Sequence, residues 1–148
     1  MFKAILAPID VAHRSSWEHA LPQAIELAAT SAGTLTVITV VRDLKAAFEG
    51  VRVSFQVDLM ISAARDKLVE IVSAYRESNV TISEEVRFGS IGHEILTTAH
   101  ERRADLIVMA SHRPELKDYL IGPNAAYVAQ HAFCSVLVLR APGRPNDR

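Results

Sequence analysis

Apolar runs of strand length recur at five places along the chain, separated by stretches whose apolar residues have helical spacing. Aliphatic and β-branched residues dominate these runs, which is typical of strands buried on both faces of a parallel sheet. The predicted strands cover residues 2–8, 34–41, 80–88, 105–110 and 135–140. Pro8 and Asp10 end the first run, so Asp10 is expected at the carboxyl end of a strand.

Between the runs, apolar residues recur every three or four positions, which indicates amphipathic helices. Three of the predicted helices begin at residues 15, 56 and 124, and another follows a tight turn at residues 89–94. They end near residues 31, 75, 103 and 131. Ser15 and Glu18 have the spacing of a capping box at the first helix start. Pro22 lies beyond that first turn, where it should bend the helix or delay its start, and we expect a kink. Residues 42–53 carry mixed signals and are predicted to form a mobile connection with one helical turn.

Strands that alternate with helices from end to end predict an α/β fold. We expect a single doubly wound, mostly parallel five-stranded sheet with helices on both faces. No internal repeat or linker divides the chain, so the domain is predicted to span residues 1–140. Residues 141–148 hold two prolines, a glycine and polar residues, and are predicted to form a disordered tail.

The composition narrows the class of protein. A chain of 148 residues can bury a core without disulfides, and its one cysteine, Cys134, cannot form an intrachain bridge. The net charge of −1, with acids and bases interspersed, disfavours broad binding to nucleic acid or to anionic membranes. No signal-peptide pattern is present, and no apolar run reaches the roughly 18 residues of a membrane span. We therefore expect a cytoplasmic protein.

Candidate binding residues gather where the predicted strands end. These are Pro8 and Asp10 after the first strand, Val40 and Val41 in the second, and Met109, Ala110, Ser111, His112 and Arg113 around the end of the fourth. Since ligands of open α/β sheets bind outside the carboxyl ends of the strands, these residues are expected to share one crevice.

Phosphate is the ligand chemistry that this crevice favours. Ser111, His112 and Arg113 supply a hydroxyl, an imidazole and a guanidinium that can bond a phosphate bidentately. Gly122 and Asn124 open the last predicted helix, whose N-terminal N–H groups favour an anion. Two alternatives stay open: Asp10 can cap a local turn, and a solvated loop would also contain these polar residues.

Several other chemistries lack their sequence signals. The six histidines show no pair with the spacing of a known metal motif, and a single cysteine provides no thiolate set. The chain contains neither a phosphate-binding loop ending in Gly-Lys-Ser/Thr nor a Gly-x-Ser-x-Gly nucleophile elbow. Cys134 is interpreted as a small buried residue next to an apolar strand.

Three stretches of the chain resemble the universal stress protein family in both order and spacing. They are Ile5-Leu6-Ala7-Pro8-Ile9-Asp10, residues 107–114 with 119–126, and residues 131–140. The Ala-Ser-His-Arg-Pro form of residues 110–114 is similar to the enterobacterial F/G-type branch. The resemblance covers the chain to about Arg140 and implies the α/β fold of small domains like those that bind nucleotides.

The glycine pattern of the ATP-binding members is only partly kept. Those members carry Gly-x-x-Gly, nine residues and Gly-Ser/Thr, and the corresponding residues here are Ala110, Arg113, Gly122 and Pro123, with a loop one residue shorter. Ala110 is a mild change, and Arg113 replaces backbone freedom with a side chain that seeks phosphate. Pro123 removes both an N–H and a hydroxyl. Asn124, Ala125 and the N–H groups that follow remain.

The resemblance implies a site for ATP, or for AMP or ADP, with or without Mg²⁺. In that site Asp10 would meet the ribose or the adenine, and Val40 would line the adenine slot with Pro8 and Met109. No general base is placed by the sequence, so we expect at most slow ATP hydrolysis and assign no catalytic residue.

The resemblance also implies a homodimer formed through the strand from Ser135 to Arg140, a short apolar edge that is exposed unless paired. The expected function is that of a sensor or regulator in the stress response. One alternative is a dimeric protein-interaction module that has lost nucleotide binding. A more distant alternative is a small hydrolase or transferase that uses the same crevice.

Overall fold

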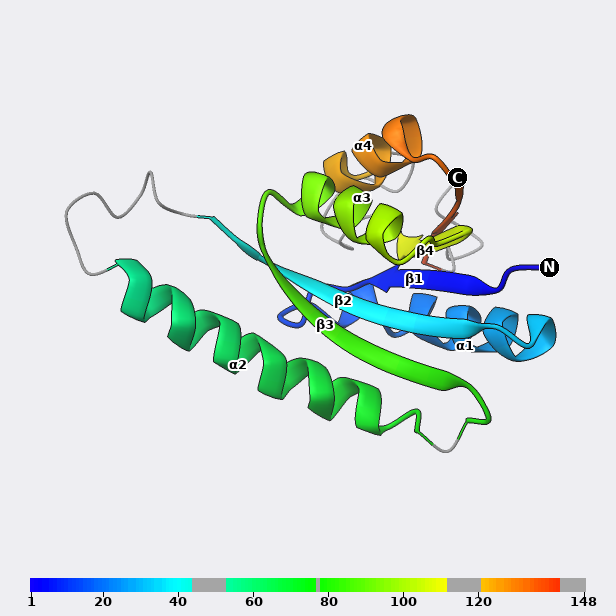
Figure 1. Ribbon diagram of the computed structural model, residues 1–148, viewed down its shortest axis with the longest axis horizontal. Coiled ribbons are helices and arrows are strands. Elements are labelled where there is room, and N and C mark those ends of the chain that lie inside the picture. Colours follow the sequence, from blue (N-terminus) through cyan, green and yellow to red (C-terminus); the bar gives the residue numbers. More distant parts are fainter. Residues whose placement is uncertain (44–52, 77, 112–120, 142–148) are drawn as a thin grey trace, which may run out of the picture.

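The structure is a computed structural model and describes residues 1–43, 53–76, 78–111 and 121–141 (Figure 1). The strands are β1 (Ala4–Pro8), β2 (Thr34–Arg42), β3 (Thr81–Gly89), β4 (Leu106–Ala110) and β5 (Ser135–Leu139). The α-helices are α1 (Ala20–Ser31), α2 (Val53–Ser73), α3 (Ile91–Glu101) and α4 (Pro123–His131). Each predicted strand is present and ends within two residues of its predicted bounds. Most of the predicted mobile connection and nearly all of the predicted disordered tail lie outside the described residues.

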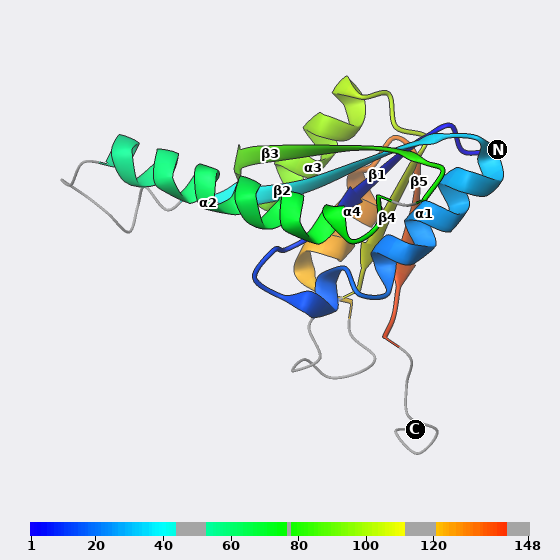
Figure 2. The same ribbon diagram turned by 90° about the horizontal axis from the view of Figure 1, so that it is seen from below.

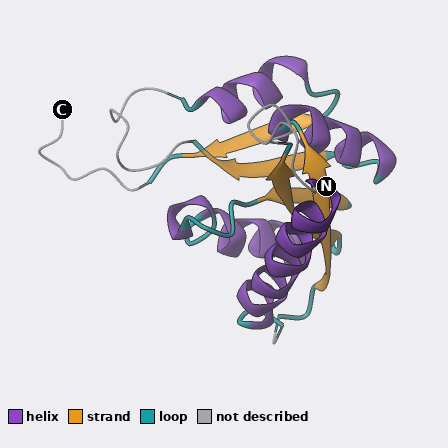
Figure 3. Cartoon of the chain, turned by 90° about the vertical axis from the view of Figure 1, so that its left-hand side faces the viewer, coloured by secondary structure: helices purple, strands orange, loops and turns teal. Residues whose placement is uncertain are grey.

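The strands form one parallel sheet in the order β3-β2-β1-β4-β5. The chain winds outward from β1 through β2 to β3, then returns to the other side of β1 to form β4 and β5. Because crossovers between parallel strands are right-handed, this reversal places α1 and α2 on one face and α3 and α4 on the other. Figures 2 and 3 show the sheet between these two helical layers. The prediction of a doubly wound parallel sheet is confirmed.

The core is divided into two halves by the alternation of side chains along each strand. Ile5 and Ala7 face α1 and α2, whereas Leu6 between them faces α3 and α4. All three are at most 2% exposed. Burial on both faces explains why β1 is an unbroken apolar run in the sequence rather than an alternating one.

The predicted start of the first helix is wrong. Residues 14–16 form a 3₁₀ turn, η1 (Arg14–Ser16), and α1 begins only at Ala20. Pro22 therefore lies in the first turn of α1, where its missing N–H costs no helical hydrogen bond. The proline delays the helix start, and α1 continues unbroken to Ser31 instead of showing the expected kink.

The prediction that the second helix lies against the sheet is confirmed for its C-terminal half. Leu68, Ile71 and Val72 are buried against the sheet. Leu59 and Met60, assigned to the same apolar face, are 56% and 38% exposed. The first turns of α2 extend past the carboxyl ends of β2 and β3, so none of the described strands lies beneath them (Figure 1).

Candidate functional site

The carboxyl ends of β1, β2 and β4 form the floor of the candidate site. The order of the strands reverses between β1 and β4, which is the switch point where an open sheet leaves a crevice. Val40 of β2 and Met109 of β4 both pack on the α3/α4 side of the sheet. Pro8 follows Leu6 by two residues on β1 and shares that side. The structure thus brings Pro8, Val40 and Met109 to one face and one end of the sheet.

Asp10 lies just beyond β1, and its carboxylate takes part in a local turn. Its Oδ1 accepts the N–H of Ala12 at 3.0 Å, and its Oδ2 lies 2.8 Å from Nδ1 of His13. The His13 N–H also donates to the Asp10 carbonyl at 3.0 Å. The side chain remains 46% exposed. These contacts are the ones that the turn-capping alternative expects. A contact between Asp10 and a ribose stays a prediction.

Ser16 supports Asp10 from the 3₁₀ turn, a role that the sequence analysis missed. The Asp10 N–H donates to Ser16 Oγ at 2.8 Å, and the same hydroxyl donates to the Asp10 carbonyl at 2.9 Å. These bonds satisfy the backbone of Asp10 on both sides and hold it at the end of β1. The available signal was the Ser16 hydroxyl in the short link between β1 and α1. The sequence analysis instead assigned this link to a capping box at a helix start.

Ser111 joins the end of β4 to the start of α4. Its N–H donates to the Leu139 carbonyl at 2.8 Å, and its carbonyl accepts the N–H of Gly122 at 2.7 Å. Ser111 is 3% exposed and Gly122 is buried. The two ends of the segment that connects them are therefore held together at the switch point, next to Ala110. Two predicted site residues, His112 and Arg113, lie within that segment and outside the described residues.

The N-terminus of α4 provides two backbone donors. Gly122 is the N-cap in an extended conformation, with φ −60° and ψ 156°, and no side chain caps the helix. Pro123 is the first helical residue and has no N–H, while the Ala126 N–H donates to the Gly122 carbonyl. The N–H groups of Asn124 and Ala125 have no acceptor among the described residues. A helix start with such free donors carries a partial positive charge that attracts anions.

In the part of the chain that the structure describes, no three His, Cys, Asp or Glu side chains could hold a metal ion together. Among the same residues, no helix combines the length and the apolar character that a membrane crossing requires.

Comparison with known sequences links the chain to a family. The model of the universal stress protein family matches residues 1–140. Universal stress protein G of Shigella flexneri is 31% identical over 144 residues, which cover 95% of this chain and 100% of that protein. The resemblance to the enterobacterial branch is confirmed by this similarity.

Solved structures share the fold. Universal stress protein UspA from Lactobacillus plantarum superposes with a TM-score of 0.77 at 23% identity, covering 93% of this chain and 97% of that chain. A universal stress protein in complex with cAMP has a TM-score of 0.71 at 19% identity, covering 94% and 97%. One from Archaeoglobus fulgidus in complex with dAMP has a TM-score of 0.68 at 20% identity, covering 93% and 98%.

Proposed function

Since the chain belongs to the universal stress protein family, we propose that it binds an adenine nucleotide at the carboxyl ends of β1, β2 and β4. ATP is the proposed ligand, with AMP and ADP as related ones and Mg²⁺ as an accompanying ion. Two structural neighbours that carry cAMP and dAMP support adenine as the base. Binding would serve a cytoplasmic stress sensor or regulator, with at most slow hydrolysis.

The free donors at the start of α4 are the observation that carries this proposal. The N–H groups of Asn124 and Ala125 lie on the same segment as Gly122, whose backbone is bonded to Ser111 at the end of β4. A phosphate at this point would accept both N–H groups and meet the positive end of the helix dipole. His112 and Arg113 are proposed to complete the phosphate site from the connecting segment.

The base and the sugar are assigned to the strand ends. An adenine ring would lie over Pro8, Val40 and Met109, which share one side of the sheet. Asp10 would accept a hydrogen bond from the ribose, because carboxylates at strand ends do so in nucleotide folds. Its exposed carboxylate would then exchange a contact with His13 for one with the sugar.

A protein-interaction module without nucleotide is the second candidate function. Pro123 favours it, since this residue supplies neither the N–H nor the hydroxyl that a serine would add to a phosphate site. Either function is proposed to operate in a homodimer that pairs through the strand from Ser135 to Arg140.

A charge placed at the helix start tests the nucleotide proposal. Asn124→Asp should weaken ATP binding at least about tenfold, because its carboxylate would repel the phosphates, while the same charge stabilises the helix N-terminus by about 0.3–1 kcal/mol. Isothermal titration calorimetry measures the affinity, and thermal unfolding without ligand measures the stability. Gln130→Glu is the matched control, with the same charge change at the exposed C-terminal end of α4.

The outcomes separate the two candidate functions. No heat and no thermal shift with ATP, AMP or dAMP at millimolar concentration would leave the interaction module as the function. Equal loss of affinity in Asn124→Asp and Gln130→Glu would show that the phosphates bind elsewhere. Pro123→Ser should tighten ATP binding, since it restores a donor, and an unchanged affinity would contradict the role given to this residue.

A further inference from the structure

The position of α4 decides where the two backbone donors at its N-terminus lie. α4 has nine residues, of which Ala125 and Val128 are buried in the half of the core that α3 and α4 share. The Gly122 N–H donates to the Ser111 carbonyl at 2.7 Å and ties the helix to β4. A binding site must hold its groups within about 0.5 Å of their productive places. The contacts that fix α4 relative to α3 therefore bear on the two donors.

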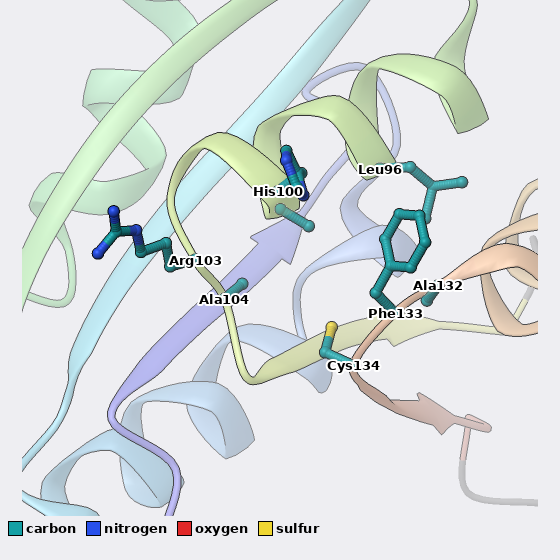
Figure 4. Close-up of a pocket in the computed structure, with 8 residues that line it drawn as sticks. Leu96, His100, Arg103, Ala104, Ala132, Phe133 and Cys134 are labelled. Atoms are coloured by element: carbon teal, nitrogen blue, oxygen red, sulfur yellow. The ribbon is translucent and has the colours of Figure 1, made fainter.

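At their C-terminal ends, α3 and α4 are separated by a hollow of about 530 Å³ (Figure 4). Leu96 and His100 line it from α3, and Ala132 and Phe133 line it from the link that follows α4. The ring of Phe133 is 90% exposed, and its centroid lies 6.0 Å from that of His100. Among the described residues, these ends of the two helices are therefore loosely packed.

The N-terminal ends of α3 and α4 are in close contact instead. Gly92 is buried in the first turn of α3, and the ring of Tyr127 occupies the space of the side chain that Gly92 lacks. A Cβ at position 92 would lie 2.3 Å from Cδ1 of Tyr127, whereas real contacts of a Cβ are at least 3.0 Å long. The ring can therefore stand where it does because position 92 is a glycine.

The ring of Tyr127 is also in contact with its own helix. The imidazole of His131, one turn further along α4, stacks on the ring with the centroids 4.4 Å apart. Nδ1 of His131 donates to the Tyr127 carbonyl at 2.9 Å, which fixes the imidazole in turn. Although Tyr127 is 40% exposed, its ring thus has a partner on α3 and another on α4. A displacement of the ring by α3 would be passed to α4.

We propose that Tyr127, packed on Gly92, is a positioning residue that sets the two backbone donors at the start of α4 for a phosphate. Asn124 and Ala125 lie within one turn of Tyr127, so their N–H groups share its movements. To make room for a Cβ at position 92, the ring must retreat from 2.3 to 3.0 Å, or by about 0.7 Å. This exceeds the tolerance of about 0.5 Å. The proposal rests on the proposed nucleotide function and adds to it a residue of α4 that does not touch the ligand.

Two ligands distinguish this role from a merely structural one. ATP would use the donors at the start of α4, whereas adenosine has the same base and sugar but no phosphate. Gly92→Ala should lower the affinity for ATP at least about tenfold, since a hydrogen bond to a charged group is lost. The affinity for adenosine should change less than about twofold. Isothermal titration calorimetry measures both affinities, and thermal unfolding without ligand shows that the variant is folded.

The same substitution in a chain without the ring is the matched control. In a Tyr127→Ala background the added methyl group meets no ring, so Gly92→Ala should change the ATP affinity less than about twofold. Tyr127→Phe keeps the ring and should bind ATP as the natural chain does. An equal cost of Gly92→Ala in both backgrounds would overturn the positioning role. So would an equal loss of affinity for ATP and for adenosine.

The two proposals fail in different ways. If the natural chain binds neither ATP nor adenosine at millimolar concentration, the nucleotide function and the positioning role are both refuted. If the natural chain and a folded Gly92→Ala chain bind ATP equally well, only the positioning role is refuted. Should Gly92→Ala not fold, Tyr127→Ala alone tests the role. It should lower the ATP affinity at least about threefold and keep the adenosine affinity, and an unchanged ATP affinity would overturn the proposal.

Discussion

The two edge strands of the sheet differ in length and in charge. β3 has nine residues, of which Glu84, Glu85 and Arg87 are charged. β5 has five residues and none of them is charged. Charged side chains on an edge strand discourage pairing with another chain, whereas an apolar edge invites it. The comparison makes β3 the better protected edge and β5 the edge through which the proposed homodimer would pair.

The charges on the β3 side also fasten the strand to α3. Arg87 donates to Glu94 and Glu101 of α3, at 3.1 and 2.9 Å, and to Glu85 of its own strand at 3.1 Å. Burial would lower the pKa of Arg87, but its hydrogen bonds to the three glutamates outweigh that cost and raise the pKa above its ordinary value. The side chain is 23% exposed. Arg87 thus places a charge on the β3 edge and also binds α3, the helix that follows β3.

A proline on the outer edge of β5 should have the largest effect, which is on the dissociation constant of the proposed dimer. Val138→Pro removes an N–H that faces outward, since the Leu139 carbonyl accepts the Ser111 N–H on the β4 side, and leaves the bonds to β4 in place. A symmetric dimer would lose two hydrogen bonds of about 1 kcal/mol each, which weakens dimerisation at least about 30-fold. Analytical ultracentrifugation measures the dissociation constant, and circular dichroism monitors the fold.

The matched control for this change lies on the other edge. The Gly89 carbonyl accepts the Asp43 N–H on the β2 side, so Val86, three residues earlier, turns its backbone outward. Val86→Pro should leave the dissociation constant unchanged. If both prolines weaken association equally, the contrast between the edges is wrong.

Removing the arginine of the β3 edge should have the next largest effect. Arg87→Met would leave Glu94, which is 17% exposed, without its cation, whereas Glu85 would keep Arg102 at 2.7 Å. Breaking a fully buried pair costs about 3–5 kcal/mol, and partial exposure reduces the expected loss here to about 2 kcal/mol. Urea unfolding measures this loss. Arg14→Met removes a cation that is 82% exposed and should cost less than about 0.5 kcal/mol.

Removing a charge from the β3 edge should have a smaller effect, which is on association between molecules. Glu84→Val removes a charge from the edge, together with an ion pair to Arg76. We expect species larger than the proposed dimer to form as the concentration rises, with an association constant raised a few-fold. The reason is that the β3 edge loses one of the charges that discourage pairing. Light scattering over a range of concentrations detects it. Glu70→Val, on the exposed surface of α2, should not produce the same change.

The smallest expected effect concerns the thiol next to β5. Burial raises the pKa of Cys134. The folded protein therefore keeps the thiol neutral where the unfolded chain ionises it, so the free energy of unfolding should fall as the pH rises above about 8.5. Cys134→Ser should remove that part of the pH dependence, a difference of about 1–2 °C in melting temperature at about pH 10. Parallel pH curves for the two proteins would contradict it.

Local patterns were sufficient for the strands but not for the contacts of the candidate site. The apolar runs predicted β1 and β4 because burial on both faces leaves no polar position in such a strand. Asp10 was placed correctly at a strand end, but its bonds to Ala12 and Ser16 depend on the path of the chain after β1. Pro22 allowed either a bend in α1 or a delayed start of the helix. The pattern of side chains does not choose between these two outcomes.

By itself, the sequence determined the α/β class, the order of the elements, the family and the apolar character of β5. These follow from the spacing of side chains, which is a local property. Only the tertiary structure decided which residues meet. The reversal between β1 and β4 gathers Pro8, Val40 and Met109. The hydrogen bonds of Ser111 anchor α4 beside them, and the link between α4 and β5 leaves Phe133 exposed. Such contacts join residues far apart in the chain, and no local pattern encodes them.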